Sequence, residues 1–356
     1  MLSRRAVPSC AVLALFQAGV FCLLSSGLIS SPVTLAQDRK TVSSQKPGEQ
    51  DVDPDDVISV NTTEVLLPVT VRDHSGQLVT DLTRKSFRVF EDGVEQPLSD
   101  LSLRQVPVDV VLMVDASSSV ADNLDDFRSA AEGFAQYLAS DDRISLIQFD
   151  DRVLLLQDWT KNRVQLRRSL RRVAPGMFTR FNAAIVLAAR EQFARGNARR
   201  AIIVLTDGID SGRGTTFDLA LRAALESQAT VYVVSNTEIE RAKKQTQLGN
   251  LLGATTATVR FNQIQIDDLR MGLEALDVSE TNLDHLTTTT GGRLYKPRSF
   301  RDLENTYVEV ANELRHQYAL YYAPLNKTRD GRFRRVRVET EPRYRVSARV
   351  GYYAPK

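Results

Sequence analysis

The stretch of sequence that decides the fold is residues 108–119, which read VDVVLMVDASSS. Val108 to Val114 is almost entirely apolar, as expected of a strand buried on both faces of a parallel sheet. Apolar residues at helical spacing follow it, and further apolar runs alternate with helical segments up to about residue 314. Strands that alternate with helices predict an α/β fold with a doubly wound, mostly parallel sheet.

This predicted α/β domain spans residues 107–314. It contains a segment at about 238–284 that is longer than a usual connecting loop, so we treat it as an insertion of unknown purpose.

The segments on both sides of the α/β domain have the pattern of antiparallel strands. Residues 57–106 contain an alternating run from Val65 to Val71, and residues 315–356 contain three more alternating stretches. Each flank alone is too small for independent stability. We therefore predict that the two flanks pair into one β-sandwich-like module.

The first 36 residues resemble a secretory signal peptide. Arg4 and Arg5 precede an apolar stretch, and Thr34-Leu35-Ala36 offers the small residues that signal peptidase requires. A retained membrane anchor stays open as an alternative, because the apolar stretch is long enough to span a bilayer. Residues 37–56 are polar and predict a flexible linker. We expect an exported chain, in the periplasm, on the outer surface or in the medium, with no membrane insertion after cleavage.

Charge and cysteine content exclude several classes of function. Arg4 and Arg5 are the only basic residues among the first 36, and without them the 46 Lys and Arg residues fall to 44, which equals the 44 Asp and Glu residues. A neutral mature chain argues against nucleic acid or an anionic membrane as the main partner. Cys10 and Cys22 both lie in the leader, so the mature chain has no disulfide, thiolate metal site or cysteine nucleophile.

Side chains that carry oxygen gather where the predicted strands end. Asp115, Ser117 and Ser119 follow the first strand, Asp207 ends a later strand, and Thr179 precedes the helix between them. Ligands of open α/β sheets bind at the carboxyl ends of the strands. Carboxylates and hydroxyls are hard donors, which suit Mg²⁺, Mn²⁺ or Ca²⁺.

With these residues the sequence resembles the von Willebrand factor A family, whose metal-ion-dependent adhesion site combines an Asp-x-Ser-x-Ser motif with a separate threonine and a later aspartate. The resemblance implies five cation ligands: Asp115, Ser117, Ser119, Thr179 and Asp207. It covers residues 108–314. The turn 90–93 and the closing residues 349–353 are similar to those of an exported bacterial group of this family first described in acidobacteria.

A local structural role for these residues remains open. Ser119 and Thr179 are good helix N-caps, and Asp207 suits a tight turn. Capping does not require two inward carboxylates on neighbouring strands, which favours the cation. The family often has two glycines before its threonine, whereas this chain has Met177 and Phe178, which could shift the loop or form part of the ligand surface.

The resemblance implies that an acidic residue of a partner completes the coordination of the cation. Mg²⁺ takes six ligands, and the chain offers about five, which leaves one position open. We expect a non-enzymatic adhesion module that binds an Asp, Glu or C-terminal carboxylate of a partner protein through the metal. A metal-assisted hydrolase is the rival class, with Asp150 and Asp210 as candidate bases. A scaffold with a vacant site is the third possibility.

Overall fold

The computed structural model describes residues 64–356 except 104–105, 119, 121–122, 194–197 and 213. The predicted leader, the predicted linker and Ser119 lie outside the described residues.

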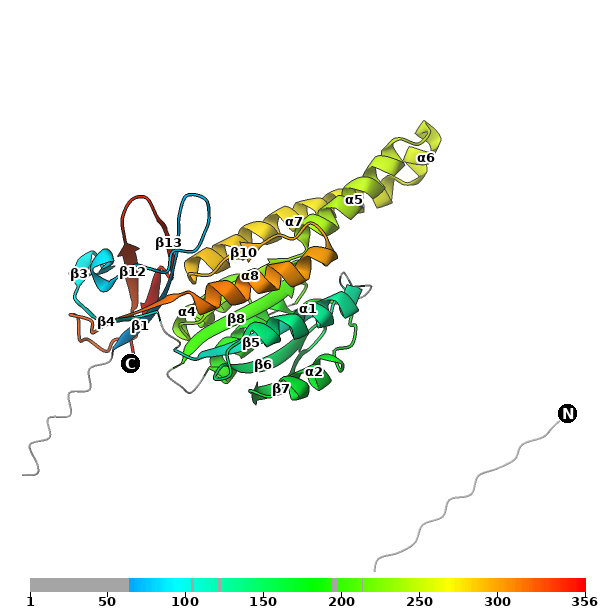
Figure 1. The fold of residues 1–356 in the computed structure, drawn as a ribbon. Coiled ribbons are helices and arrows are strands. Elements are labelled where there is room, and N and C mark those ends of the chain that lie inside the picture. The colour runs from blue at the N-terminus through cyan, green and yellow to red at the C-terminus, as the bar shows by residue number, and fades with distance from the viewer. Residues whose placement is uncertain (1–63, 104–105, 119, 121–122, 194–197, 213) are drawn as a thin grey trace, which may run out of the picture. The chain divides into compact units, whose positions relative to one another are not determined.

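A six-stranded sheet forms the centre of the α/β domain (Figure 1). Its strands are β5 (Val108–Asp115), β6 (Arg143–Phe149), β7 (Val153–Thr160), β8 (Arg199–Thr206), β9 (Thr230–Ser235) and β10 (Leu294–Tyr295). They lie in the order β10-β9-β8-β5-β6-β7, and every neighbouring pair is parallel except β6 with β7. All eight residues of the central strand β5 are buried, which explains its apolar run and confirms the predicted sheet.

Helices cover both faces of this sheet. One face packs against α1 (Leu124–Tyr137), α2 (Arg163–Leu170) and α8 (Leu303–Arg315), which follows the short η4 (Phe300–Asp302). The other packs against α3 (Phe181–Leu187), α4 (Phe217–Glu226) and α7 (Gln263–Thr289), and the π-helical turn η3 (Ala188–Gln192) extends α3. Alternate residues of β5 serve the two faces: Val110 and Leu112 lie in the first core, and Val111 and Met113 in the second.

The segment predicted as an insertion is helical. α5 (Thr237–Leu252) and α7 pack against each other, and α6 (Thr256–Phe261) lies between them in the chain. Figure 1 shows this hairpin extending past the other elements, with α6 at its far end. We call α5, α6 and α7 the helical hairpin.

Two small antiparallel sheets form the β-module from both flanks of the chain. The strands are β1 (Val65–Arg72), β2 (Arg88–Glu91), β3 (Val94–Gln96), β4 (Leu98–Ser102), β11 (Tyr318–Tyr322), β12 (Phe333–Glu339), β13 (Arg345–Ala348) and β14 (Gly351–Tyr353), with the turn η1 (Arg84–Ser86). Their orders are β13-β1-β11-β4 and β14-β12-β2-β3. Each sheet mixes N-terminal and C-terminal strands, and one apolar core contains residues of both. The predicted pairing of the flanks is confirmed.

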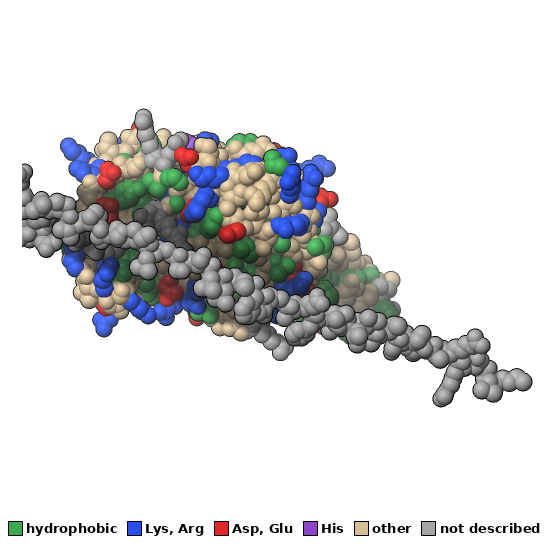
Figure 2. All heavy atoms as spheres, turned by 90° about the horizontal axis from the view of Figure 1, so that it is seen from below, with side chains coloured by type: hydrophobic (Ala, Val, Ile, Leu, Met, Phe, Trp, Pro, Cys, Tyr) green, Lys and Arg blue, Asp and Glu red, His purple; other side chains and the backbone are tan. Residues whose placement is uncertain are grey.

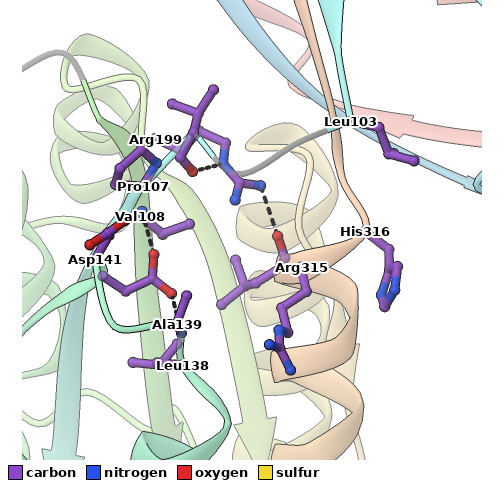
Figure 3. Close-up of a pocket in the computed structure, with 12 residues that line it drawn as sticks. Leu103, Pro107, Val108, Leu138, Ala139, Asp141, Arg199, Arg315 and His316 are labelled. Atoms are coloured by element: carbon purple, nitrogen blue, oxygen red, sulfur yellow. Dashed lines mark hydrogen bonds between the residues drawn. The ribbon is translucent and has the colours of Figure 1, made fainter.

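A buried arginine joins the β-module to the amino ends of the sheet strands. Arg199, at the start of β8, donates to the carbonyl oxygens of Val106 (3.0 Å) and Leu314 (2.8 Å), as Figure 3 shows. On the β-module side, the carboxylate of Glu313 in α8 accepts from Arg72 and Thr70 of β1. These contacts fix the base of the domain, opposite the strand ends that carry the predicted site.

Surface charge is mixed on the face shown in Figure 2, where Asp and Glu side chains lie between those of Lys and Arg. No helix in the described part of the chain has both the length and the apolar character needed to cross a membrane.

Candidate metal centre

Asp115 is the last residue of β5, at the carboxyl end of the sheet, and its side chain is buried. Oδ1 accepts a hydrogen bond from the backbone N–H of Ser117 (2.9 Å). Oδ2 accepts from the hydroxyl of Thr206, the last residue of the neighbouring strand β8 (2.6 Å). The Thr206 hydroxyl in turn accepts from the N–H of Gly208 (2.9 Å). These bonds hold the ends of β5 and β8 in one fixed arrangement.

Asp207 directly follows β8 and is also buried. Its Oδ1 accepts from the N–H of Ile209 (3.1 Å), and its carbonyl oxygen accepts from the hydroxyl of Ser279 in α7 (2.5 Å). Gly208 has φ +71°, and a Cβ there would lie 2.6 Å from the Ser279 hydroxyl and 2.7 Å from Leu283. The turn after Asp207 therefore requires glycine, and the helical hairpin fixes its position.

Thr179 lies in a loop that approaches the other two from the side. Its N–H donates to the Ser211 hydroxyl (2.9 Å) and its carbonyl accepts from the Ser211 N–H (3.0 Å), which ties it to the segment after Asp207. Gly176 in the same loop donates to the carbonyl of Ala116 (2.7 Å). The N-cap of α3 is Arg180 and forms no side-chain capping bond, so Thr179 does not cap that helix.

The departure from the family's glycines is accommodated by an acidic side chain. The carboxylate of Asp151 accepts from the N–H groups of Met177 (3.2 Å) and Phe178 (3.1 Å). The side chains of Met177 and Phe178 are 70% and 58% exposed. They lie on the surface beside Thr179, and the loop backbone still packs against the strand ends.

The electrostatics of the site favour a cation. Burial and, after it, the negative charge of Asp207 raise the pKa of Asp115 to about 7, although hydrogen bonds from Thr206 and Ser117 act in the opposite direction. Two buried carboxylates that repel each other are stabilised by a positive charge between them. In the residues that the structure describes, no three His, Cys, Asp or Glu side chains group as metal ligands. The side chains that gather at this sheet edge offer carboxylate and hydroxyl oxygens, which fit a hard divalent cation.

The structure brings four of the five predicted ligands to one edge of the sheet: Asp115, Ser117, Thr179 and Asp207. Ser119, the fifth, lies outside the described residues. Sequence reasoning missed the residues that support them: Thr206, Ser211, Asp151 and Ser279. Thr206 was visible as a polar residue at a strand end and Asp151 as one in the turn between two strands. Nothing in the sequence connects Ser279 with Asp207, 72 residues earlier.

The two aspartates considered as catalytic bases both accept hydrogen bonds from nearby residues. Asp150 accepts from the N–H of Arg152 (3.0 Å) and from Gln148 Nε2. Asp210 accepts from the N–H of Gly212 (3.0 Å) and from the side chain of Asn182, and burial raises its pKa. Each carboxylate thus supports a loop.

The comparison with protein families agrees with this architecture. Residues 110–209 match the family model of the von Willebrand factor type A (VWA) domain, which begins in β5 and ends just after Asp207. The chain therefore contains a VWA domain. A search of curated proteins finds no significant match.

Several solved structures are similar to parts of the chain. The VWA domain of the type V pili tip protein Mfa5 from Porphyromonas gingivalis is 27% identical over 30% of this chain and 40% of its own, with a TM-score of 0.28. BatB from Bacteroides thetaiotaomicron is 25% identical over 36% and 66%, with a TM-score of 0.33. Proximal thread matrix protein 1 from the mussel byssus, with a zinc-occupied metal-ion-dependent adhesion site, is 12% identical over 63% and 49%, with a TM-score of 0.44. The chain thus spans less than half the length of the Mfa5 domain and of the thread matrix protein.

Proposed function

We propose that this chain is an exported, non-enzymatic binding module that holds one divalent cation and recognises a carboxylate of a partner protein through it. The observation that carries the proposal is the pair Asp115 and Asp207, two buried acids on neighbouring strand ends whose charges repel. Ser117, Thr179 and the predicted ligand Ser119 would complete the donor set around Mg²⁺ as the expected ion, or around Mn²⁺ or Ca²⁺. A cation bound there offsets the repulsion and leaves a coordination position for an incoming carboxylate.

Export is part of this proposal, and so is membership of the exported bacterial group that the sequence resembles. The support is the leader-like composition of residues 1–36 and the restriction of both cysteines to it. N-terminal sequencing of the protein recovered outside the cytoplasm tests it. Cleavage after Ala36 is expected, and a chain found whole in the membrane fraction would show a retained anchor instead.

Calorimetry and thermal unfolding of the purified chain test the cation site. We expect saturable stabilisation by Mg²⁺ or Mn²⁺ that is lost in Asp115→Ala and in Asp207→Ala. Zn²⁺ is included as a comparison, because a site of oxygen donors should bind it less selectively. Ser117→Ala is expected to weaken binding, whereas Ser75→Ala, at an exposed serine in the turn after β1, is the matched control and should not.

Two outcomes would support the alternative functions, a scaffold or a metal-assisted hydrolase. A folded chain that binds no cation in either form would make the module a scaffold. Cation-dependent turnover of ester or phosphoester substrates, abolished in Asp115→Ala, would make it a hydrolase.

A further inference from the structure

The helical hairpin projects beyond the edge of the sheet that carries the metal centre. Ser279 of α7 bonds to the carbonyl of Asp207, so this level of the helix lies at the carboxyl end of β8. After Ser279 the helix runs down the sheet to Thr290, whose hydroxyl accepts from the N–H of Val231 at the start of β9 (3.1 Å). Residues 263–278 therefore extend past the sheet edge, and this segment of the helix is about 24 Å long at 1.5 Å per residue. Figure 1 shows this projecting part.

Apolar side chains form an exposed stripe along the projecting part of α7. Ile264, Met271 and Val278 follow one another at intervals of seven residues and are 80%, 59% and 62% exposed. Seven residues are close to two helical turns, so the three side chains share one face, as in the seam of a coiled coil. Ala275, half-buried, lies on the same face between the last two. We call these four residues the α7 stripe.

The stripe is separate from the face with which α7 packs onto the protein. The buried residues Ile266, Leu269 and Leu276 each lie two positions from a member of the stripe. Two residues turn a helix by about 200°, which places these residues on the opposite side. Single exposed apolar residues are common on protein surfaces, but a row at heptad spacing on a projecting helix is typical of a docking face.

The C-terminal end of the stripe lies close to the metal centre. Ala275 and Val278 line a hollow of about 430 Å³ together with Ile209, which follows β8, and Phe217 of α4. The same hollow is bordered by Gly208, the residue after the predicted ligand Asp207. A segment that lies along the α7 stripe therefore ends beside the cation site.

The charges around the stripe indicate the chemistry of the partner. Asp267, Asp268 and Glu274 are exposed and lie within or beside the stripe. Asp267 pairs with Arg270 at 3.6 Å, whereas Asp268 and Glu274 form no ion pair within the described part of the chain. This surface is complementary to a helix whose apolar face is flanked by Lys or Arg.

Two other occupants fit these charges less well. A second copy of α7 would place acidic residues against acidic residues along the seam. An anionic lipid surface would be repelled by the same acids, and it would contact the tip of the hairpin rather than a stripe that runs along its length.

We propose that the α7 stripe docks a basic amphipathic helix of a partner protein, and that an acidic residue at the end of this helix reaches the cation at Asp115 and Asp207. The first half of this proposal stands on the stripe and its charges, and only the contact with the cation rests on the proposed function above.

Fluorescence anisotropy with three designed helical peptides and the full-length exported chain tests it. The first peptide, of about 21 residues or three heptads, carries Leu at the seam positions, Lys at the flanks and a C-terminal Asp. The second has Glu in place of every Lys, and the third ends in an amidated Asn. We expect the Lys peptide to bind at least about tenfold more tightly than the Glu peptide, because its flanks match Asp268 and Glu274.

Variants then locate the contact. The double variant Met271→Gln with Val278→Gln should weaken binding of the Lys peptide at least about tenfold, because two apolar side chains are no longer buried in the contact. Val164→Gln is the matched control, because Val164 is 54% exposed on α2, away from the stripe. Glu274→Lys should reduce the preference for the Lys peptide over the Glu peptide.

The outcomes separate this proposal from the cation function. Lys-peptide binding that depends on the stripe but is unchanged by chelation and by Asp115→Ala supports docking and contradicts the cation contact. Cation binding without any effect of the stripe variants on peptide binding overturns docking and leaves the cation function standing. Self-association in sedimentation, or binding to phosphatidylglycerol vesicles, that is lost in the double variant would also overturn it, since the stripe would then have another occupant.

Discussion

Two regions of the molecule contain buried carboxylates, and the two regions differ in how the negative charge is compensated. In the β-module, Glu91 accepts a hydrogen bond from Arg334 (3.1 Å) and from the hydroxyls of Tyr322 and Tyr352 (both 2.9 Å). At the sheet edge, the hydrogen bonds to Asp115 come from the hydroxyls of Thr206 and Ser117 and from a backbone N–H, and the charge that acts most strongly on it is that of another acid.

This difference separates a structural ion pair from a binding site. Burying a carboxylate is costly unless charge and hydrogen bonds compensate for it. Glu91 finds a cation within the chain, so its charge is balanced in the folded protein alone. Asp115 and Asp207 repel each other, so in the proposed site a cation from outside would balance their charge. The first arrangement stabilises the fold, and the second would favour binding of the proposed cation.

The largest expected effect on stability comes from breaking the buried ion pair between Glu91 and Arg334. Glu91→Ala should lower the free energy of unfolding by about 3–5 kcal/mol, because it leaves Arg334 buried without its partner. Urea denaturation measures the change. The control is Glu95→Ala, whose exposed pair with Arg88 should contribute little. Equal stability of the two variants would show that the buried cluster is dispensable.

At the sheet edge, removing a buried charge should instead stabilise the folded chain. The pKa of Asp115 is raised by burial and by Asp207 from 3.8 to about 7, so the folded chain binds this proton more tightly than the unfolded chain. Without a cation, stability should therefore fall as pH rises from about 4 to 7, by roughly 2–4 kcal/mol for this group. Asp115→Asn removes the decline and should be more stable than the parent chain at pH 7 in a chelator.

Saturating Mg²⁺ should reverse the sign of this pH dependence in the parent chain, because protons compete with the cation for Asp115. Thermal unfolding between pH 4 and pH 8, with Mg²⁺ and with chelator, measures both slopes. A parent chain whose stability is independent of pH in the chelator would contradict the uncompensated charge.

The contact between the helical hairpin and the metal centre should show an intermediate effect. Gly208→Ala introduces a Cβ at φ +71° that meets Ser279 and Leu283. We expect a loss of about 1–3 kcal/mol in stability together with weaker cation binding, because α7 must move away from the turn. Gly214→Ala is the matched control, since φ there is +94° but nothing lies within 4 Å of a Cβ. The same loss in both variants would mean that the contact with α7 is unimportant.

The smallest effect concerns the loop that carries Thr179. Asp151→Ala removes the acceptor for the N–H groups of Met177 and Phe178. Stability should fall by about 1 kcal/mol, and cation affinity should fall several-fold as the loop loses its position. Calorimetry with Mg²⁺ measures the affinity. Unchanged affinity would show that the bonds of Thr179 to Ser211 and of Gly176 to Ala116 hold the loop without Asp151.

The hydrophobic pattern of the sequence predicted most of the fold. Because β5 is buried on both faces, its run of apolar residues could be recognised without knowledge of its neighbours. The alternating runs around Val65 and Phe333 identified strands in the flanks, and their pairing followed from the instability of each flank alone. The helical hairpin could not be interpreted in the same way, because much of α5 and the first half of α7 is exposed to solvent and has only a weak apolar periodicity.

Only the chemistry of the site, and not its support, followed from local sequence. Asp115 and Asp207 were found because a carboxylate directly after a parallel strand lies at the edge where ligands bind. The bond from Ser279 to Asp207, the bonds from Asp151 to the Thr179 loop, and the α7 stripe depend on segments that meet only after folding.

The sequence by itself thus determined the sheet, the pairing of the flanks and the kinds of donor atom at the strand ends. These properties depend on the periodicity of burial and on side-chain chemistry, which are local. The tertiary structure decided which buried acids are balanced and where the hairpin points. Balance depends on the distance between charges far apart in the chain, as between Glu91 and Arg334 or Asp115 and Asp207. Those distances exist only in the folded protein.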